Sequence, residues 1–312
     1  MNELTVTNSN TELAIQDIGA ELFTRWIDYI DAKPKTVETY TRAIKQFFIF
    51  LQANGITRPS REDIIAYRDI LKESHKPTTV QSYIMAVKQF FNWTSQEGIY
   101  PNIAQRVKGA KLDNEHKKDY LTTKQVGTLL QNIDRSTVKG LRDYAILALM
   151  ITSGLRTIEV VRADIQDIRT VADFTALFLQ GKGHDEKNQY VKIAEPVEDA
   201  IRAYLKARGT AKATDPLFTS VSNRDKGGRM TTKSISRIAK NSLVDAGLDS
   251  DRLTAHSLRH TTATLNLLNG GTVEETQQLL RHTNINTTLI YSHALERAKN
   301  NSEDRVAKAI FG

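Results

Sequence analysis

Apolar residues recur at helical spacing in two similar segments of the first third of the chain. TVETYTRAIKQFFIFLQANGI (residues 36–56) and TVQSYIMAVKQFFNWTSQEGI (residues 79–99) align without a gap and share the KQFF block and the closing Gly-Ile. In each copy the tyrosine, an alanine or aliphatic residue and the two phenylalanines lie on one helical face, and a glycine follows where a helix would stop. The pattern predicts two similar helices, and two copies are too few for a solenoid.

A third helix is predicted between these two, over residues 60–71 (SREDIIAYRDIL). Ser60 is suited to the N-cap because its hydroxyl can accept a hydrogen bond from a free backbone N–H of the first turn. Glu62 and Asp63 would follow in that turn, where the helix dipole favours negative charge. Residues 1–107 are therefore predicted to form an all-helical module.

Residues 120–312 are predicted to form a second domain, mainly helical with a small antiparallel sheet. The predicted elements are a helix capped by Thr122 or Thr123, a buried helix over 140–154, a shorter helix over 157–165, strands over 174–180 and 188–194 joined by the turn GKGHDEK, and mostly helices from residue 196 onward. Residues 108–119 (KGAKLDNEHKKD) combine many charges with no apolar period and are predicted to be a linker. Its positive charge suits a segment that crosses a phosphate backbone, and an ordinary solvated linker fits equally well.

Composition adds a preference for a polyanionic partner and excludes some chemistry. The chain has 312 residues, which suits two domains, and its 43 Lys and Arg against 36 Asp and Glu give a formal net charge of +7. Basic residues that serve solubility alone remain an alternative. The sequence contains no cysteine, so disulfides, cysteine-ligated zinc and thiol catalysis are excluded.

Two features predict a cytoplasmic protein. The N-terminal stretch MNELTVTNSNTELAIQD lacks the apolar core of a secretory signal. The most apolar run, YAILALMITSGL, is much shorter than the roughly 20 residues that span a bilayer.

Several groups that suit phosphate binding recur at informative spacing. HSLRH (residues 256–260) places His256 and Arg259 on one helical face, and Tyr291 follows His282 within LRHTNINTTLIYSH. The remaining candidates are Arg156, at a predicted junction between two helices, and Lys182, near the tip of the predicted hairpin. Two arginines would bind phosphate oxygens through planar guanidiniums, with the histidines as further donors.

The series Arg156, Lys182, HSLRH, LLRHTN and Tyr291 resembles that of the tyrosine recombinases, the family of the lambda-type integrases and the Xer recombinases. Residues 18–105 also resemble the family's helical core-binding (SAM-like) domain. The resemblance implies a site-specific recombinase that acts on double-stranded DNA through a covalent 3'-phosphotyrosine intermediate and a Holliday junction. It also implies four protomers on DNA, and no cofactor or metal is needed because the intermediate conserves the phosphodiester's energy.

The expected roles follow from the chemistry of each group. Tyr291 is the expected nucleophile, Arg156 and Arg259 the phosphate clamp, and His282 a further donor. His256 is expected to donate a hydrogen bond or accept the tyrosine proton. Lys182 is expected to protonate the leaving 5' oxygen, with Lys187 and Lys192 as nearby competitors.

Other residues near these motifs are expected to have different roles. Glu159 is expected to orient the neighbouring arginine or to act directly, while His260 and His293 are expected to be structural. HSLRH lacks the glutamate of a zinc-binding HExxH motif, so no metal site is predicted. Arg281 departs from the family pattern, which commonly has glycine before this histidine, and it is expected either to add a phosphate contact or to crowd the site.

Alternatives remain open at the level of function and assembly. A type IB topoisomerase would use the same chemistry, and a DNA-binding regulator would use none. The tail EDRVAKAIFG (303–312) is predicted to dock into a neighbouring subunit, with packing within the same chain as the alternative. A Xer-like or compact mobile-element enzyme is preferred, since only some 17 residues precede the first predicted helix. Integration, excision, resolution and inversion are not distinguished, and accessory DNA-binding proteins are possible partners.

Overall fold

The computed structural model of the chain describes residues 21–111, 119–180, 186–222 and 225–312. The chain divides into two compact units, residues 1–115 (unit 1) and 116–312 (unit 2). Much of the segment predicted as a linker lies outside the described residues, so its boundaries stay a prediction. No helix in the described part of the chain has the length and apolar character needed to cross a membrane.

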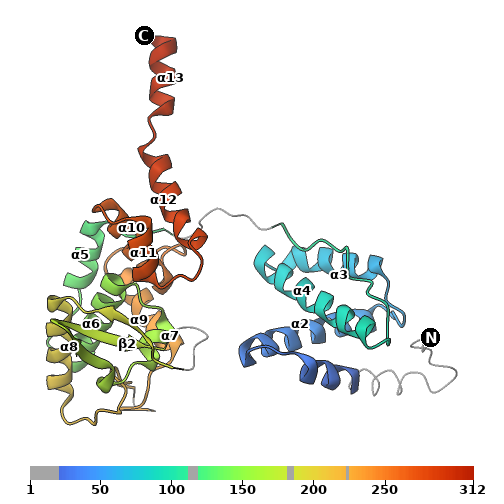
Figure 1. The fold of residues 1–312 in the computed structure, drawn as a ribbon, viewed down its shortest axis with the longest axis horizontal. Helices are drawn as coiled ribbons and strands as arrows, with labels where there is room; N and C mark the ends of the chain where they lie inside the picture. The colour runs from blue at the N-terminus through green and yellow to red at the C-terminus, as the bar shows by residue number, and fades with distance from the viewer. Residues whose placement is uncertain (1–20, 112–118, 181–185, 223–224) are drawn as a thin grey trace. The chain divides into compact units, whose positions relative to one another are not determined.

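Unit 1 is a helical module, as predicted (Figure 1). Residues 21–29 are helical, and three longer helices follow: α2 (Pro34–Ala53), α3 (Arg61–Ser74) and α4 (Pro77–Gln96). The two predicted sequence copies form α2 and α4, which pack against each other. Both begin with proline in the first turn, and both are followed by a glycine at positive φ. Proline suits the first helical turn because the N–H that it lacks would have no partner there.

The start of α3 has the predicted cap. The Ser60 hydroxyl accepts a hydrogen bond from the Asp63 N–H, and the Asp63 carboxylate accepts one from the Ser60 N–H. This capping box satisfies two backbone donors that the helix itself leaves free.

Several large aromatic side chains pack together in the core of unit 1. The ring centroid of Phe47 lies 5.1 Å from that of Tyr67 and 6.0 Å from that of Phe91. Trp26 and Trp93 are both almost fully buried, and both rings lie close to Phe90. Large buried rings supply much apolar area per residue, which matters in a unit of this size.

Unit 2 is mainly helical with one small sheet. Its elements are α5 (Thr123–Gln131), α6 (Val138–Ser153), α7 (Thr157–Arg162), the 3-10 turn η1 (Ile165–Asp167), β1 (Ile168–Val171), β2 (Phe174–Leu179), β3 (Gln189–Lys192), α8 (Glu195–Arg208), α9 (Thr232–Asp245), α10 (Ala255–Leu268), α11 (Val273–Leu280), α12 (Asn286–Lys299) and α13 (Ser302–Phe311). The mainly α fold with a small antiparallel sheet is as predicted.

The sheet has order β1-β2-β3 with both pairs antiparallel, and β1 is an addition to the two predicted strands. Leu177 of β2 pairs with Ile168 on one side and with Val191 on the other. The helix predicted over 157–165 ends at Arg162, because a 3-10 turn begins where the Asp167 carboxylate accepts a hydrogen bond from the Asp164 N–H.

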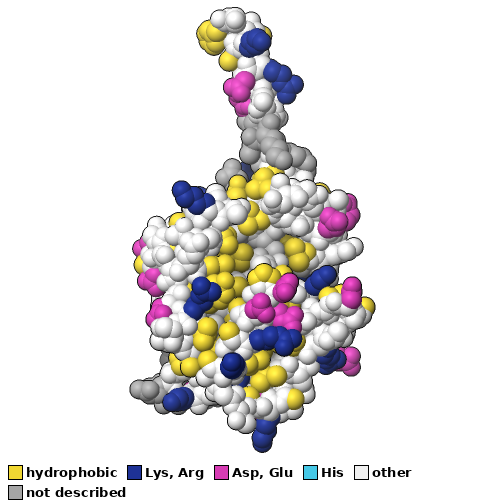
Figure 2. Space-filling view, turned by 90° about the vertical axis from the view of Figure 1, so that its left-hand side faces the viewer, with side chains coloured by type: hydrophobic (Ala, Val, Ile, Leu, Met, Phe, Trp, Pro, Cys, Tyr) yellow, Lys and Arg dark blue, Asp and Glu magenta, His cyan; other side chains and the backbone are white. Residues whose placement is uncertain are grey.

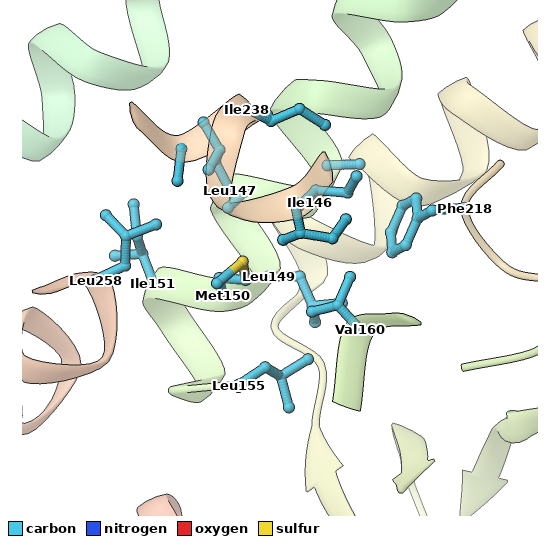
Figure 3. Packing of buried hydrophobic residues seen from close by; sticks show 14 of the residues in the cluster. Ile146, Leu147, Leu149, Met150, Ile151, Leu155, Val160, Phe218, Ile238 and Leu258 are labelled. Carbon is cyan, nitrogen blue, oxygen red and sulfur yellow. The ribbon is translucent and has the colours of Figure 1, made fainter. Parts of the chain in front are cut away.

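Helix α6 lies at the centre of unit 2, where it packs against α8 and α10. Figure 3 shows its side chains Ile146, Leu147 and Leu149 among buried residues from the surrounding elements, and none of the three is exposed. Burying one such side chain stabilises the fold by roughly 1.5–3 kcal/mol. The C-terminal end of this helix is thereby held in a fixed place, and that end supports the site described below.

Helix α13 differs from the others because none of its residues is buried. Val306, Ile310 and Phe311 are 58%, 65% and 86% exposed. Hydrophobic side chains are visible on α13 at the top of Figure 2, and others form a broad area on the face of unit 2 shown there.

Candidate active site

Helix α10 carries two of the predicted residues. Its N-terminus is fixed by a capping box between Thr254 and Ser257. His256, in the first turn, is exposed, whereas Arg259 is only 2% exposed. The Arg259 guanidinium donates hydrogen bonds to the carbonyl oxygens of Gly154 and Leu280.

Those two carbonyl groups lie at the ends of α6 and α11. The last carbonyls of a helix have no partner within the helix and carry the negative end of its dipole. Both helices end in a left-handed residue, Gly154 at φ 58° and Arg281 at φ 55°. Arg259 therefore links two helix ends, and these two hydrogen bonds fix the position of its guanidinium.

Arg156 lies three residues after Ser153, the last residue of α6, at the N-cap of α7. The carboxylate of Glu159 accepts a hydrogen bond from the Arg156 N–H (2.8 Å) and another from its guanidinium Nη1 (2.8 Å). The Glu159 side chain is fully buried, while the Arg156 side chain is 28% exposed. The structure thus supports an orienting contact between Glu159 and the neighbouring arginine.

His282 follows the left-handed end of α11. Its Nδ1 lies 2.9 Å from the hydroxyl of Thr288, a residue with no exposed surface, and its carbonyl accepts a hydrogen bond from the Gln277 amide. With Nδ1 engaged by Thr288, Nε2 is the ring nitrogen that remains for a bound group.

Tyr291 lies on α12 and is 7% exposed. Its ring centroid is 5.3 Å from that of His260, which in turn is 4.6 Å from that of His256. It also belongs to a small apolar cluster with Ala263 and Leu280. These contacts seat the tyrosine beside α10 and the end of α11.

One cavity of about 430 Å³ brings these residues together. Five of the six predicted site residues line it: Arg156, His256, Arg259, His282 and Tyr291. The sixth, Lys182, lies outside the described residues. His293 has no described side chain.

The two competing lysines are described, and neither is among the residues lining this cavity. Lys187 donates to the carboxylates of Asp164 (2.6 Å) and Asp167. The Lys192 ammonium lies 5.0 Å from the ring centroid of Phe174. Both thus have local structural contacts.

Burial and positive charge together shift the pKa values of the side chains that line the cavity. Burial raises the pKa of Tyr291 to about 12, although the guanidiniums of Arg259 and Arg156 oppose this. Burial and the same two arginines lower the pKa of His282 to about 4, so its imidazole is neutral at pH 7. Burial and the charge of Arg156 also lower the pKa of Arg259 to about 9, which leaves it cationic.

Glu159 is the acidic partner of the two other arginines of the site. Although burial favours its neutral form, ion pairs with Arg281 and Arg156 hold the pKa of Glu159 below its usual value. Three guanidiniums and one carboxylate therefore lie at or beside the cavity. Their net positive charge favours an anionic ligand.

Sequence reasoning missed three contributions to this site. Gln189 of β3 lines the cavity, Thr288 holds the His282 ring, and Arg281 forms an ion pair with Glu159. Only Arg281 carried a signal, as a departure from the glycine of the family pattern.

Comparisons with known proteins agree with this architecture. The sequence profile of the Phage integrase family matches residues 119–297, and the profile of the Phage integrase, N-terminal SAM-like domain matches residues 21–101. The Tyrosine recombinase XerC of Caldanaerobacter subterraneus subsp. tengcongensis is 35% identical over 196 residues, which cover 62% of this chain and 52% of the relative. The Tyrosine recombinase XerC of Chlamydia muridarum is 33% identical over 206 residues, which cover 66% and 63%. The chain thus matches from about half to just under two thirds of the length of these relatives.

Solved structures share the fold at lower sequence identity. The XerH site-specific recombinase bound to palindromic difH substrate, a post-cleavage complex, has a TM-score of 0.71 at 20% identity and covers 86% of this chain and 80% of its own. A lambda integrase (75-356) dimer bound to a COC' core site has a TM-score of 0.69 at 17% identity and covers 87% and 94%. The profile match over residues 119–297 spans more than half of the chain, so the protein belongs to the phage integrase family, the tyrosine recombinases that its motifs resemble.

Proposed function

We propose that this protein is a site-specific DNA recombinase that cuts and rejoins double-stranded DNA through a covalent 3'-phosphotyrosine intermediate. The observation that carries the proposal is that Tyr291 shares one cavity with the two arginines Arg156 and Arg259 and with His256 and His282. A nucleophile beside a cluster of phosphate-binding groups is the arrangement that phosphodiester cleavage requires.

The arginines stabilise the scissile phosphate and the charge that grows on its oxygens in the transition state. Each guanidinium keeps its charge and offers a planar fork of donors. Arg156 is held by Glu159, and Arg259 is held by two helix ends, so little reorganisation is needed when DNA binds. His282, neutral in the free protein, donates its Nε2–H to the same phosphate when the Thr288 hydroxyl donates to Nδ1.

The chemical step exchanges one phosphodiester for another. The Tyr291 hydroxyl oxygen forms a bond to phosphorus, the bond from phosphorus to the 5' oxygen breaks, and a 3'-phosphotyrosine remains. His256 accepts the tyrosine proton, and Lys182 donates a proton to the leaving 5' oxygen. The reverse attack, by the 5' hydroxyl of another strand, rejoins the DNA without an external energy source.

Assembly extends the proposal from one phosphate to whole DNA sites. A lambda integrase with this fold has been solved as a tetramer bound to a Holliday junction. We propose that this chain likewise acts as four protomers on two sites through such a junction, with the tail from residue 303 onward docked into a neighbouring subunit. Lys and Arg side chains of both units would neutralise DNA phosphates.

Covalent capture tests the chemistry. The wild-type protein and Tyr291→Phe are incubated with nicked duplexes that carry candidate sites from the host or a mobile element, and the products are separated on a denaturing gel. We expect a protein band shifted by DNA for the wild type and no such band for Tyr291→Phe. The matched control is Tyr190→Phe, which removes an exposed tyrosine hydroxyl from β3 and is expected to retain the adduct.

Two outcomes would redirect the proposal. DNA that the wild type binds without forming an adduct would favour a regulator that lacks catalysis. An adduct accompanied by relaxation of supercoiled DNA lacking a recombination site would favour topoisomerase activity.

A further inference from the structure

Arg281 has a backbone conformation that normally favours glycine. Its φ is 55° and its ψ 46°, in the left-handed region, and it ends α11 one residue before His282. A side chain there costs roughly 1–2 kcal/mol relative to the right-handed conformation. Interactions of the arginine side chain must therefore favour its presence at this position.

The Arg281 side chain is among those lining the cavity, but it is only 5% exposed. Its Nη2 donates to the Glu159 carboxylate (2.9 Å), and its Nη1 donates to the carbonyl oxygen of Leu279 (2.7 Å). The guanidinium is thus engaged by a buried carboxylate and by the end of its own helix. This placement favours a structural link over a direct contact with DNA.

Glu159 connects Arg281 to a residue of the proposed phosphate clamp. Its Oε2 accepts hydrogen bonds from both the Arg281 guanidinium and the Arg156 N–H, while its Oε1 accepts one from the Arg156 guanidinium. One fully buried carboxylate is therefore shared by two arginines that lie far apart in the sequence.

We propose that Arg281 is a positioning residue that fixes Arg156 through Glu159 and ties the segment bearing His282 to the start of α7. The inference rests on the proposed function, because its purpose is to hold the phosphate clamp in place. If Arg281 is lost, Arg156 is the one guanidinium that still binds the Glu159 carboxylate. The carboxylate can then rotate away from the orientation in which it holds Arg156.

Single-turnover cleavage separates positioning from DNA binding. Wild type, Arg281→Gly and Arg281→Lys are mixed in excess with a nicked duplex from which the wild type forms the covalent adduct, and affinity is measured by gel shift. We expect Arg281→Gly to bind this duplex within about threefold of wild type but to form the adduct roughly 10- to 100-fold more slowly at saturation. Arg281→Lys, which retains a cation for Glu159, should recover most of the rate.

Two further variants make the comparison specific. Arg252→Ala removes another arginine and its exposed ion pair with Asp119 (2.9 Å). Arg252 is not among the residues lining the cavity, so this variant should leave the rate unchanged. In a Glu159→Gln background, Arg281→Gly should reduce the rate much less than it does in wild type. Both substitutions remove the same ion pair, so the second has little left to remove.

The possible results are distinguishable. The inference is overturned if Arg281→Gly cleaves at the wild-type rate. It is also overturned if the rate loss of the double variant equals the product of the losses of Arg281→Gly and Glu159→Gln. If Arg281→Gly fails to fold, Arg281→Gln, which removes the cation but keeps a side chain, is compared in the wild-type and Glu159→Gln backgrounds by the same criterion. Failure of the wild type to form any adduct would instead count against the proposed function.

Discussion

The charge of the cavity residue His282 depends strongly on its surroundings. Burial and the positive charges of Arg259, Arg156 and Arg281 lower its pKa to about 4, with His256 as a further contributor. The unperturbed value is about 6.5. His282 therefore binds a proton less readily in the folded protein than in the unfolded chain.

This difference predicts how stability changes with pH. As the pH falls from 7 to 4.5, the unfolded chain binds a proton at His282 and the folded chain largely does not, so the free energy of unfolding decreases. We expect His282→Gln to lose less stability over this range, by on the order of 1–2 kcal/mol after allowance for solvent screening. Urea unfolding of both proteins at pH 7 and pH 4.5 measures this difference in the free energy of unfolding. An equal loss of stability in the two proteins would contradict the pKa assigned to His282.

At the scale of single residues, the sequence indicated the proposed reactive groups better than the residues that hold them in place. Arg259 and Tyr291 lie in motifs whose local spacing could be recognised, and both line the cavity. The contact between Glu159 and Arg281 joins residues 122 positions apart, which no local pattern encodes. The buried Thr288 was likewise hidden, because a threonine in a helix has no distinctive spacing of its own.

Helix ends were predictable where the sequence carries their local chemistry. Ser60 and Thr122 both form capping boxes at the positions proposed for a cap. The strand β1 was not predicted because it is four residues long and its central residues are exposed, so it shows little apolar pattern. Its pairing with β2 supplies the order that its own sequence does not.

The end of α6 is an element boundary on which the cavity depends. A Cβ atom added to Gly154 would lie 2.5 Å from a methyl carbon of Leu280, the residue whose carbonyl binds Arg259 and whose side chain contacts the Tyr291 cluster. We expect Gly154→Ala to destabilise unit 2 by about 2–3 kcal/mol, combining the left-handed backbone cost with the displacement of Leu280.

Gly247 provides the matched control for this substitution. It follows α9 at φ 73°, and a Cβ atom there would meet no atom within 4 Å. Gly247→Ala should therefore cost only the backbone term, about 1 kcal/mol. Urea unfolding followed by circular dichroism compares the two variants, and equal losses would show that the contact with Leu280 is relieved without cost.

At the scale of the whole molecule, α13 presents an exposed apolar face. Val306, Ile310 and Phe311 line one side of the helix and are all exposed. We expect serine at these three positions to weaken assembly on DNA while leaving binding of a single protomer intact, because docking in trans would bury them.

Gel filtration of the protein with a two-site DNA measures this effect. Lys308→Gln is the matched control, since it changes α13 without removing apolar surface. Unchanged assembly of the serine variant would favour the alternative in which the tail packs within its own chain.

The buried aromatic core of unit 1 has an optical consequence. The protein has two tryptophans, Trp26 and Trp93, and both lie in that core. The proposed catalytic residues all belong to the other unit, which has tyrosine as its main fluorophore. Tryptophan emission therefore reports on unit 1 alone, and the protein carries its own spectroscopic label for following that unit separately from the reaction proposed at Tyr291.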